Sequence, residues 1–212
     1  MSAKTETLLA YARLAPVIPV VTIEDARRSI DLAQALVEGG LRVVEVTLRT
    51  PAALDAIAAI AKAVPEAVVA AGTVVSGSQI AEVVDAGAKF IVTPGTPTRL
   101  AEALAEAAIP VMPGCATVAE AMTLMSLGFK ALKFFPAAAS GGAAWLRALH
   151  GPLPDAAFCP TGGIDLAHAP TYLALPNVIC VGGTWVAPAA AIRDGDFATI
   201  GRLASEAAAL RP

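Results

Sequence analysis

The chain has 212 residues, of which 56% are hydrophobic and 16% are charged, and its formal net charge is -3. This composition supplies a sizeable core for one barrel-sized domain and excludes an intrinsically disordered chain. No block of lysines and arginines occurs, so we expect neither a nucleic-acid partner nor a polybasic membrane anchor.

The sequence also argues against a membrane span and a secretory signal. The longest stretch without Asp, Glu, Lys or Arg is 166–192, and it contains Pro170, Pro176 and Pro188, which break helices. Charged residues interrupt the first 14 positions, where a signal peptide has an apolar core. The three cysteines form no CxxC pair and are interpreted as buried core thiols. We therefore expect a cytoplasmic protein.

Eight short apolar runs recur along the chain and are predicted to be strands. Their starts lie about 21 to 26 residues apart, which leaves room for a helix and two loops between successive strands. Continuous apolar runs of this length are typical of parallel strands that are buried on both faces. The predicted strands are Val17–Val21, Val43–Thr47, Ala67–Thr73, Lys89–Pro94, Pro110–Gly114, Ala131–Phe135, Ala157–Gly163 and Val178–Thr184.

The segments between these runs carry helix signals. Thr50-Pro51 and Thr96-Pro97 each place a capping residue before a proline at the first helical position. Thr117-Val118-Ala119-Glu120 is a capping box. Glycines fall where helices should stop, at Gly39-Gly40, Gly87 and Gly128.

Eight strand–helix alternations predict an α/β fold, a single (β/α)8 TIM barrel over residues 1–212 with a helix before the first strand. The alternative is a doubly wound open sheet, which more typically has about five or six strands and often a glycine-rich phosphate loop. Neither GxGxxG nor GxxxxGK[ST] occurs in the chain. The barrel predicts that active residues cluster at the C-terminal ends of the strands.

Glu45 interrupts the apolar run Val43–Thr47. Because side chains alternate along a strand, Val44 and Val46 share the face toward the helices, and Glu45 points into the barrel. A carboxylate in that place is costly unless it is paired or hydrogen-bonded. An ion pair with Arg49 or with a lysine, serving stability alone, is one interpretation of Glu45, and a catalytic group is the other.

Lys133 interrupts the run Ala131–Phe135 in the same way, so Lys133 and Phe135 are expected to point inward. Burial disfavours the ammonium form, and the free amine of a desolvated lysine can attack a carbonyl. The structural alternative is a lysine that reaches out of the barrel end or merely pairs with Glu45. Together, an inward glutamate and an inward lysine on different strands form a candidate acid/base and nucleophile pair.

Glycine pairs follow the last two predicted strands, in Thr161-Gly162-Gly163 and in Gly182-Gly183-Thr184. Barrels often bind phosphate on these two loops, because glycines let backbone N–H groups approach the oxygens; two ordinary turns are the alternative. Thr73 and Pro94 end the third and fourth predicted strands at the same rim. Thr73 is expected to hydrogen-bond a substrate carboxylate, with Arg49 supplying the charge, unless it only caps the next helix.

A metal site is not expected. His150 and His168 are the only histidines, neither ends a predicted strand, and neither HxH nor HExxH occurs. Both are interpreted as surface or helix-end residues.

Six sequence motifs follow one another along the chain: Val44-Glu45-Val46-Thr47-Leu48-Arg49-Thr50, Ala71-Gly72-Thr73-Val74, Thr93-Pro94-Gly95, Lys133-Phe134-Phe135-Pro136, Cys159-Pro160-Thr161-Gly162-Gly163-Ile164 and Val181-Gly182-Gly183-Thr184-Trp185. In this order they resemble the family of 2-keto-3-deoxy-6-phosphogluconate (KDPG) and 4-hydroxy-2-oxoglutarate (KHG) aldolases. The resemblance covers nearly the whole chain.

The resemblance implies a cofactor-independent class I aldolase, usually a homotrimer, in sugar-acid breakdown of the Entner–Doudoroff type. Such an enzyme cleaves the phosphorylated 2-keto acid KDPG to pyruvate and glyceraldehyde 3-phosphate, and KHG to pyruvate and glyoxylate. By match of motif, Lys133 takes the Schiff-base role and Glu45 the acid/base role. The substrate-binding residues implied by the motifs are Arg49, Thr73, Pro94, Phe135, Thr161, Gly162, Gly163, Gly182, Gly183 and Thr184.

The chain departs from the family at two positions, one in this set and one just beyond the strand that carries Lys133. Thr184 stands where serine is common, and its methyl group is expected to crowd the phosphate. Ala138 stands where glutamate is common, which puts the local loop structure in question. Two other classes are alternatives that the inward lysine counts against: a metal-dependent aldolase or decarboxylase, and a non-catalytic barrel that binds a phosphosugar.

Overall fold

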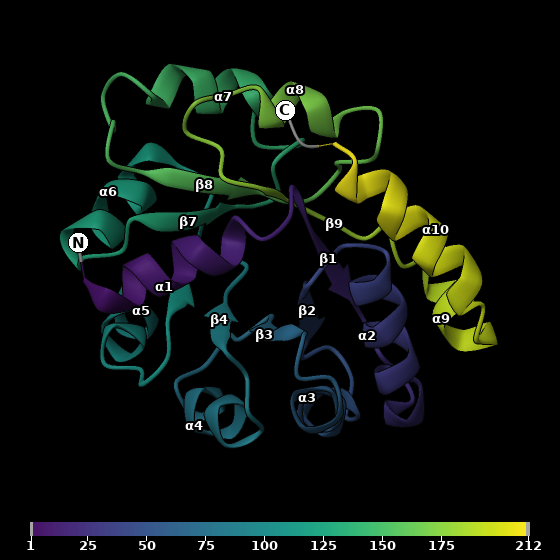
Figure 1. Cartoon of the computed structure of the whole chain (residues 1–212). Helices are drawn as coiled ribbons and strands as arrows, with labels where there is room; N and C mark the ends of the chain where they lie inside the picture. The colour runs from purple at the N-terminus through teal and green to yellow at the C-terminus, as the bar shows by residue number, and fades with distance from the viewer. Residues whose placement is uncertain (1, 211–212) are drawn as a thin grey trace.

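The computed structural model describes residues 2–210, whose strands are arranged around a common axis (Figure 1). The strands are β1 (Val17–Val21), β2 (Val43–Thr47), β3 (Val68–Gly72), β4 (Phe90–Val92), β5 (Val111–Met112), β6 (Gly114–Cys115), β7 (Ala131–Phe134), β8 (Ala157–Pro160) and β9 (Val181–Gly183). They form one parallel sheet in the order β5-β4-β3-β2-β1-β9 and a second in the order β6-β7-β8.

Two connections close these sheets into one barrel. β5 and β6 are the halves of a single barrel strand, separated only by Pro113. At the other side, the bridges Phe158–Val178 and Thr161–Gly182 join β8 to β9. The predicted eight-stranded barrel is therefore confirmed, and the doubly wound open sheet is wrong.

Helices connect successive strands and surround the barrel (Figure 1). Helix α1 (Ala3–Ala12) precedes β1, and the 3-10 turn η1 (Ala26–Arg28) leads into α2 (Ser29–Glu38). The remaining helices are α3 (Ala53–Ala63), α4 (Ser78–Asp85), α5 (Thr98–Ala105), α6 (Val118–Ser126), α7 (Gly142–Leu149), α8 (Ala169–Leu173), α9 (Ala189–Asp194) and α10 (Phe197–Ala208).

The buried apolar side chains form two layers, one inside the barrel and one between the strands and the helices. Helix α1 lies across the N-terminal end of the barrel (Figure 1), where its Leu8, Leu9 and Ala12 join the inner layer. The buried polar side chains of the barrel strands and their exits lie nearer the opposite end: Glu45, Thr47, Thr93, Lys133 and Thr161. Apolar side chains thus fill the N-terminal end of the barrel, and the buried polar side chains lie toward its C-terminal end.

Two predicted helix caps are wrong. Neither α3 nor α5 has a side-chain cap. The hydroxyl of Thr50 instead donates to the carbonyl oxygen of Ile23 at 2.5 Å, and that of Thr96 donates to the carbonyl oxygen of Gly114 at 2.9 Å. Both threonines therefore tie a loop to a neighbouring part of the barrel.

The other helix signals are confirmed. The Thr117 hydroxyl accepts from the N–H of Glu120 at 3.2 Å, and the Glu120 carboxylate accepts from the N–H of Thr117 at 2.9 Å, which completes the capping box. Gly40, Gly87 and Gly128 follow α2, α4 and α6 with φ of 93°, 91° and 92°, left-handed conformations that favour glycine.

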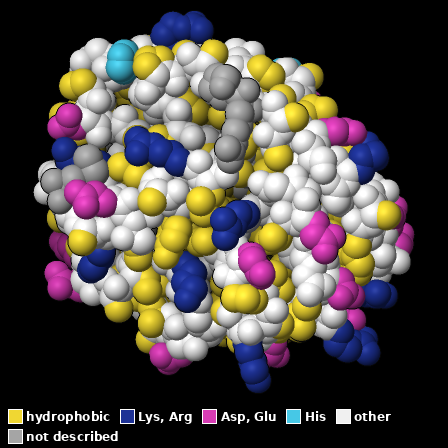
Figure 2. Space-filling model, in the orientation of Figure 1, with side chains coloured by type: hydrophobic (Ala, Val, Ile, Leu, Met, Phe, Trp, Pro, Cys, Tyr) yellow, Lys and Arg dark blue, Asp and Glu magenta, His cyan; other side chains and the backbone are white. Residues whose placement is uncertain are grey.

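Three further expectations concern surface charge, membrane spans and the cysteines. On the face that α1 crosses, positive and negative side chains are interspersed (Figure 2). Within residues 2–210, no helix is both apolar enough and long enough to cross a lipid bilayer. Cys115, Cys159 and Cys180 are buried free thiols, as predicted.

Candidate active site at the C-terminal end of the barrel

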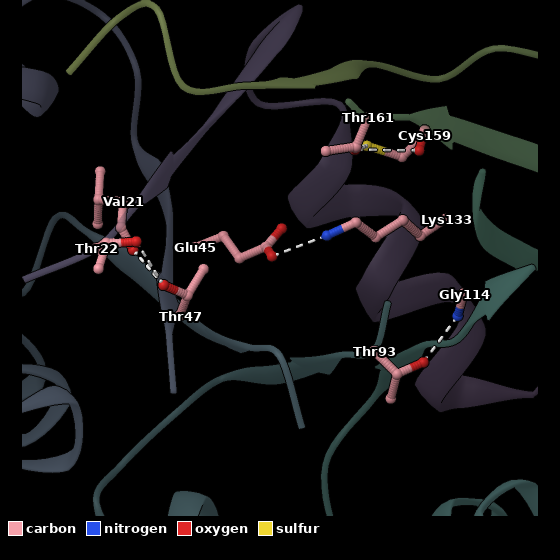
Figure 3. A network of polar contacts seen from close by, with 9 residues as sticks. All are labelled: Val21, Thr22, Glu45, Thr47, Thr93, Gly114, Lys133, Cys159 and Thr161. Atoms are coloured by element: carbon pink, nitrogen blue, oxygen red, sulfur yellow. Dashed lines mark hydrogen bonds and ion pairs between the residues drawn. The ribbon is translucent and has the colours of Figure 1, made fainter. Parts of the chain in front are cut away.

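Glu45 and Lys133 meet inside the barrel (Figure 3). Glu45 comes from β2 and is 3% exposed, Lys133 comes from β7 and is 4% exposed, and Nζ lies 3.0 Å from Oε1. Val44 and Val46 point the other way, into the layer under the helices. The predicted inward direction of both side chains is therefore confirmed, and the partner of Glu45 is Lys133 rather than Arg49.

Packing behind β7 holds Lys133 inward. Phe134 stacks on Trp145 of α7, with ring centroids 4.1 Å apart and ring planes 5° from parallel. Because successive side chains alternate across a strand, this contact on the helix side directs Lys133 to the barrel side. Phe135 lies beyond the strand, and the centroid of its half-buried ring is 5.4 Å from the Lys133 Nζ. The lysine thus meets a carboxylate and an aromatic ring.

Hydroxyl groups fix the end of β2 that carries Glu45. The Thr47 hydroxyl donates to the carbonyl oxygen of Val21 at 2.9 Å. The hydroxyl of Thr22 lies 3.0 Å from that of Thr47, and since Thr47 has already given its proton, Thr22 is the donor. These bonds join the ends of β1 and β2 (Figure 3). The sequence offered one signal for Thr47, which shares the inward parity of Glu45.

Two thiols share the barrel interior with this pair. Cys159 is the register partner of Lys133 across β7 and β8. A hydrogen bond with Cys159, together with burial and the nearby charge of Glu45, raises the pKa of Cys180 well above its ordinary value of 9.0. A thiol held protonated is a poor nucleophile. Cys180 is therefore not expected to compete with Lys133 as a nucleophile next to Glu45.

Thr73 follows β3 in an unusual backbone conformation. Its φ is 60°, the only positive φ of a non-glycine residue in the part of the chain that the structure describes. Left-handed backbone is costly for a β-branched residue and is often kept at functional sites. The N-cap of α4 is Gly77 and has no side-chain bond, so Thr73 does not cap that helix. Arg49, beyond β2, is exposed, and Pro94, beyond β4, is half-buried.

The loop after β8 packs against the segment after β7. Gly162 and Gly163 have φ of 98° and 73°, which favour glycine. A β-carbon on Gly162 would lie 3.1 Å from the Phe135 ring, and one on Gly163 would lie 2.6 Å from the Ala138 Cβ. The Ala138 N–H also donates to the carbonyl of Gly162 at 3.0 Å. The glycine loop therefore lies beside the exit of the strand that carries Lys133.

The second glycine pair lies beside the first, because Thr161 and Gly182 form a bridge. A β-carbon on Gly182 would collide with the side chain of Thr161, and one on Gly183 would collide with the indole of Trp185. Packing alone thus explains why glycine occupies both positions, as expected if the two loops are ordinary turns. The juxtaposition of the two loops, with Thr184 exposed next to them, is what a phosphate site requires.

The histidines and acids do not gather. Among residues 2–210, no group of three or more His, Cys, Asp and Glu side chains is placed to hold a metal ion. His168 lies 2.7 Å from Asp165 at the start of α8, and His150 follows α7, with both histidines exposed. The residues that the site does bring together are an amine, a carboxylate and a rim of hydroxyls and glycines, which suits carbonyl chemistry.

The chain is similar over most of its length to characterised aldolases. The family model described as KDPG and KHG aldolase matches residues 9–203. The KHG/KDPG aldolase of Escherichia coli K12 is 51% identical over 192 residues, which cover 91% of this chain and 90% of that protein.

Two solved structures have the same fold, each with a TM-score of 0.92. One is the KDPG aldolase of Legionella pneumophila with pyruvate captured as a covalent carbinolamine, which is 42% identical and covers 94% of this chain and 97% of its own. The other is the KDPG aldolase of Zymomonas mobilis with 3-phosphoglycerate, which is 43% identical; the match covers 99% of this chain and 98% of the Zymomonas chain. The barrel, the buried lysine–glutamate pair and these similarities together show that the chain belongs to the KDPG and KHG aldolase family.

Proposed function

We propose that this protein is a class I aldolase that cleaves KDPG to pyruvate and glyceraldehyde 3-phosphate, with KHG as a second substrate. The observation that carries the proposal is the pair of buried side chains Lys133 and Glu45, 3.0 Å apart inside the barrel. An ion pair kept only for stability would have the same distance. The named relatives and the carbinolamine in the Legionella structure favour the catalytic interpretation.

Lys133 is the proposed Schiff-base residue. A proton shift from Nζ to Oε1 of Glu45 leaves a free amine beside a neutral carboxylic acid. The amine adds to C2 of the keto acid to give a carbinolamine, and Glu45 returns the proton as the C2 hydroxyl leaves as water. Glu45 then accepts the proton of the C4 hydroxyl while the C3–C4 electron pair moves toward the iminium. Protonation at C3 and hydrolysis release pyruvate and restore Lys133.

The proposed substrate contacts follow from the positions of the rim residues. Arg49 and Thr73 would bind the keto-acid carboxylate, and Pro94 and Phe135 would line its three-carbon end. The phosphate would lie on the backbone N–H groups of the two adjacent loops, with hydroxyls from Thr161 and Thr184. Remote phosphate binding would hold the breaking bond next to Lys133.

The family also suggests a cytoplasmic homotrimer that acts in the Entner–Doudoroff pathway, and we propose the same for this chain. Its other expected features are a small phosphorylated partner and no nucleic acid, membrane or cofactor. Light scattering coupled to gel filtration tests the trimer, because a monomer or dimer at micromolar concentration contradicts it.

Borohydride trapping with pyruvate tests the function. We expect one reduced three-carbon adduct on Lys133 by peptide mass spectrometry, and none in Lys133→Ala. Glu45→Gln should lower kcat for pyruvate release by about 10²- to 10⁴-fold, the usual contribution of a general acid/base, while some adduct still forms. An adduct on another lysine, or near-normal turnover in Glu45→Gln, contradicts these roles.

Two controls separate the other classes of function. A metal-dependent aldolase or decarboxylase would lose activity in a chelator, whereas the Schiff-base enzyme would keep it. A non-catalytic barrel would bind KDPG without releasing pyruvate. Comparing KDPG with KHG and with the C4 stereoisomers establishes which substrate is preferred.

A further inference from the structure

The barrel wall beside Lys133 has a break in its backbone ladder. The fifth barrel strand consists of β5 and β6. Its first half pairs with β4, in the register Ile91–Val111 and Val92–Met112. Its second half pairs with β7, and that register begins at Gly114–Lys133. Pro113 lies between the two halves and has no N–H. Gly114 therefore pairs with Lys133 of β7 on one side. On its other side it has no register partner in β4, because that register ends at Met112.

Two threonine side chains take the place of the missing ladder. The Gly114 N–H donates to the Thr93 hydroxyl at 2.8 Å, and the Thr96 hydroxyl donates to the Gly114 carbonyl oxygen at 2.9 Å. The two hydroxyl oxygens are 2.7 Å apart. Since Thr96 has given its proton to a carbonyl, Thr93 must donate to Thr96. The three bonds form a closed ring in which each hydroxyl donates once and accepts once.

The Thr93 side of the ring is buried and closely confined, whereas Thr96 is half-buried. Thr93 has no exposed surface, so water does not compete for its hydroxyl. A β-carbon on Gly114 would lie 2.5 Å from the carbonyl groups of Thr93 and Pro94, which shows how closely the end of β4 approaches this glycine. On its other side, the fifth barrel strand holds β7 through the Lys133 N–H, which donates to the carbonyl oxygen of Pro113 at 2.9 Å.

We infer that Thr93 is a positioning residue for Lys133. It holds Gly114, and Gly114 is the register partner of Lys133 in the neighbouring strand (Figure 3). Glu45 stands on β2, beyond β3 and β4 in the order of strands on this side of the wall. The place of β6 relative to β4 therefore contributes to the distance between the amine and the carboxylate. The inference rests on the proposed function, because only a reacting Lys133 makes that distance matter.

The test compares Thr93→Val with Thr93→Ser. Valine keeps the shape of threonine but cannot accept from Gly114, whereas serine keeps the hydroxyl. A misplacement of about 1 Å commonly costs about 10²-fold in rate, so we expect Thr93→Val to lower kcat and the rate of borohydride trapping with pyruvate about 10- to 100-fold, with a much smaller change in KM. Thr93→Ser should stay within about threefold of the parent chain.

Further variants keep the inference falsifiable. If Thr93→Val does not fold, Thr96→Val opens the same ring at the Gly114 carbonyl and should lower the trapping rate about tenfold. Thr123→Val is the matched control, because the exposed Thr123 hydroxyl donates only to a helix carbonyl, that of Ala119. Normal kcat in a folded Thr93→Val or Thr96→Val, or a serine variant as slow as the valine one, overturns the inference. Failure of the parent chain to trap pyruvate at Lys133 would instead overturn the proposed function.

Discussion

The carboxylate of Glu45 occupies the space that a side chain on Gly72 would need. A β-carbon on Gly72 would lie 2.6 Å from Cγ of Glu45 and 2.8 Å from Cδ, and it would collide with Oε1. The two residues stand on neighbouring strands, where Glu45 pairs in register with Ala70 and Thr47 with Gly72. The absence of a side chain at position 72 is therefore what lets the carboxylate lie beside β3 and reach Lys133.

Gly72→Ala should displace Glu45 from Lys133. We expect kcat for pyruvate release to fall about 10²-fold, because the acid/base group moves by a large part of an ångström. The control is Gly77→Ala, where the nearest atom to a new β-carbon is the Ala103 Cβ at 3.9 Å. Steady-state kinetics at a temperature where both variants are folded decides the matter, and equal turnover in the two would contradict the role of Gly72.

Gly163→Ala tests the phosphate end of the site separately from its chemistry. The backbone there has a φ of 73° and a new methyl group would press on Ala138, so the loop must shift. We expect KM for KDPG to rise about tenfold, a loss of about 1.4 kcal/mol of binding, while pyruvate trapping at Lys133 changes little.

The control for backbone strain alone is Gly128→Ala, since Gly128 has a φ of 92° and nothing lies within 4 Å of its β-carbon position. The unphosphorylated substrate KHG should be nearly insensitive to Gly163→Ala. An equal rise in KM for KHG and KDPG would contradict the assignment of this loop to phosphate binding.

The direction of the two reactive side chains could be read from the sequence because strand alternation is a local rule. Val44 and Val46 define the outer face of β2, and Leu132 and Phe134 define that of β7, so Glu45 and Lys133 had to point inward. Their mutual distance could not be read in this way. It depends on the closure of the barrel, in which β2 and β7 stand apart in the strand order.

The threonine contacts show where local patterns mislead. A threonine before a proline is a good helix cap by composition, yet Thr50 bonds to a carbonyl 27 residues away and Thr96 to one 18 residues away. The acceptors are available only after the barrel has formed, so no local window reveals them. The same holds for Gly182, whose neighbour in space is the side chain of Thr161, 21 residues away in the sequence.

The three thiols should react slowly in the native protein, because all three are buried. Burial, with a smaller contribution from the charge of Glu120, raises the pKa of Cys115 to about 12, and the pKa of Cys180 is also raised. At pH 8 the thiolate fraction of Cys115 is then about 10⁻⁴. Iodoacetamide should leave the native chain unlabelled over an hour at pH 8 and label three cysteines after denaturation. Rapid labelling of the folded enzyme would mean that the interior opens readily.

Glu120 should make the start of α6 sensitive to acid. The N–H of Ala116 and, less strongly, that of Thr117 hold the pKa of this carboxyl below its ordinary value of 4.5. The folded state therefore favours the ionised form, and this stability is present above pH 4.5 and is lost as the pH falls through the lower folded value. Because Glu120 is exposed, Glu120→Gln should reduce the free energy of urea unfolding at pH 7 by only about 0.5 kcal/mol. The difference from the parent chain should shrink steadily as the pH falls below 4.5. Glu82→Gln, which removes an exposed charge from α4, is the control for the change in net charge. If the difference in unfolding free energy between Glu120→Gln and the parent chain grew in acid, the assignment would be contradicted.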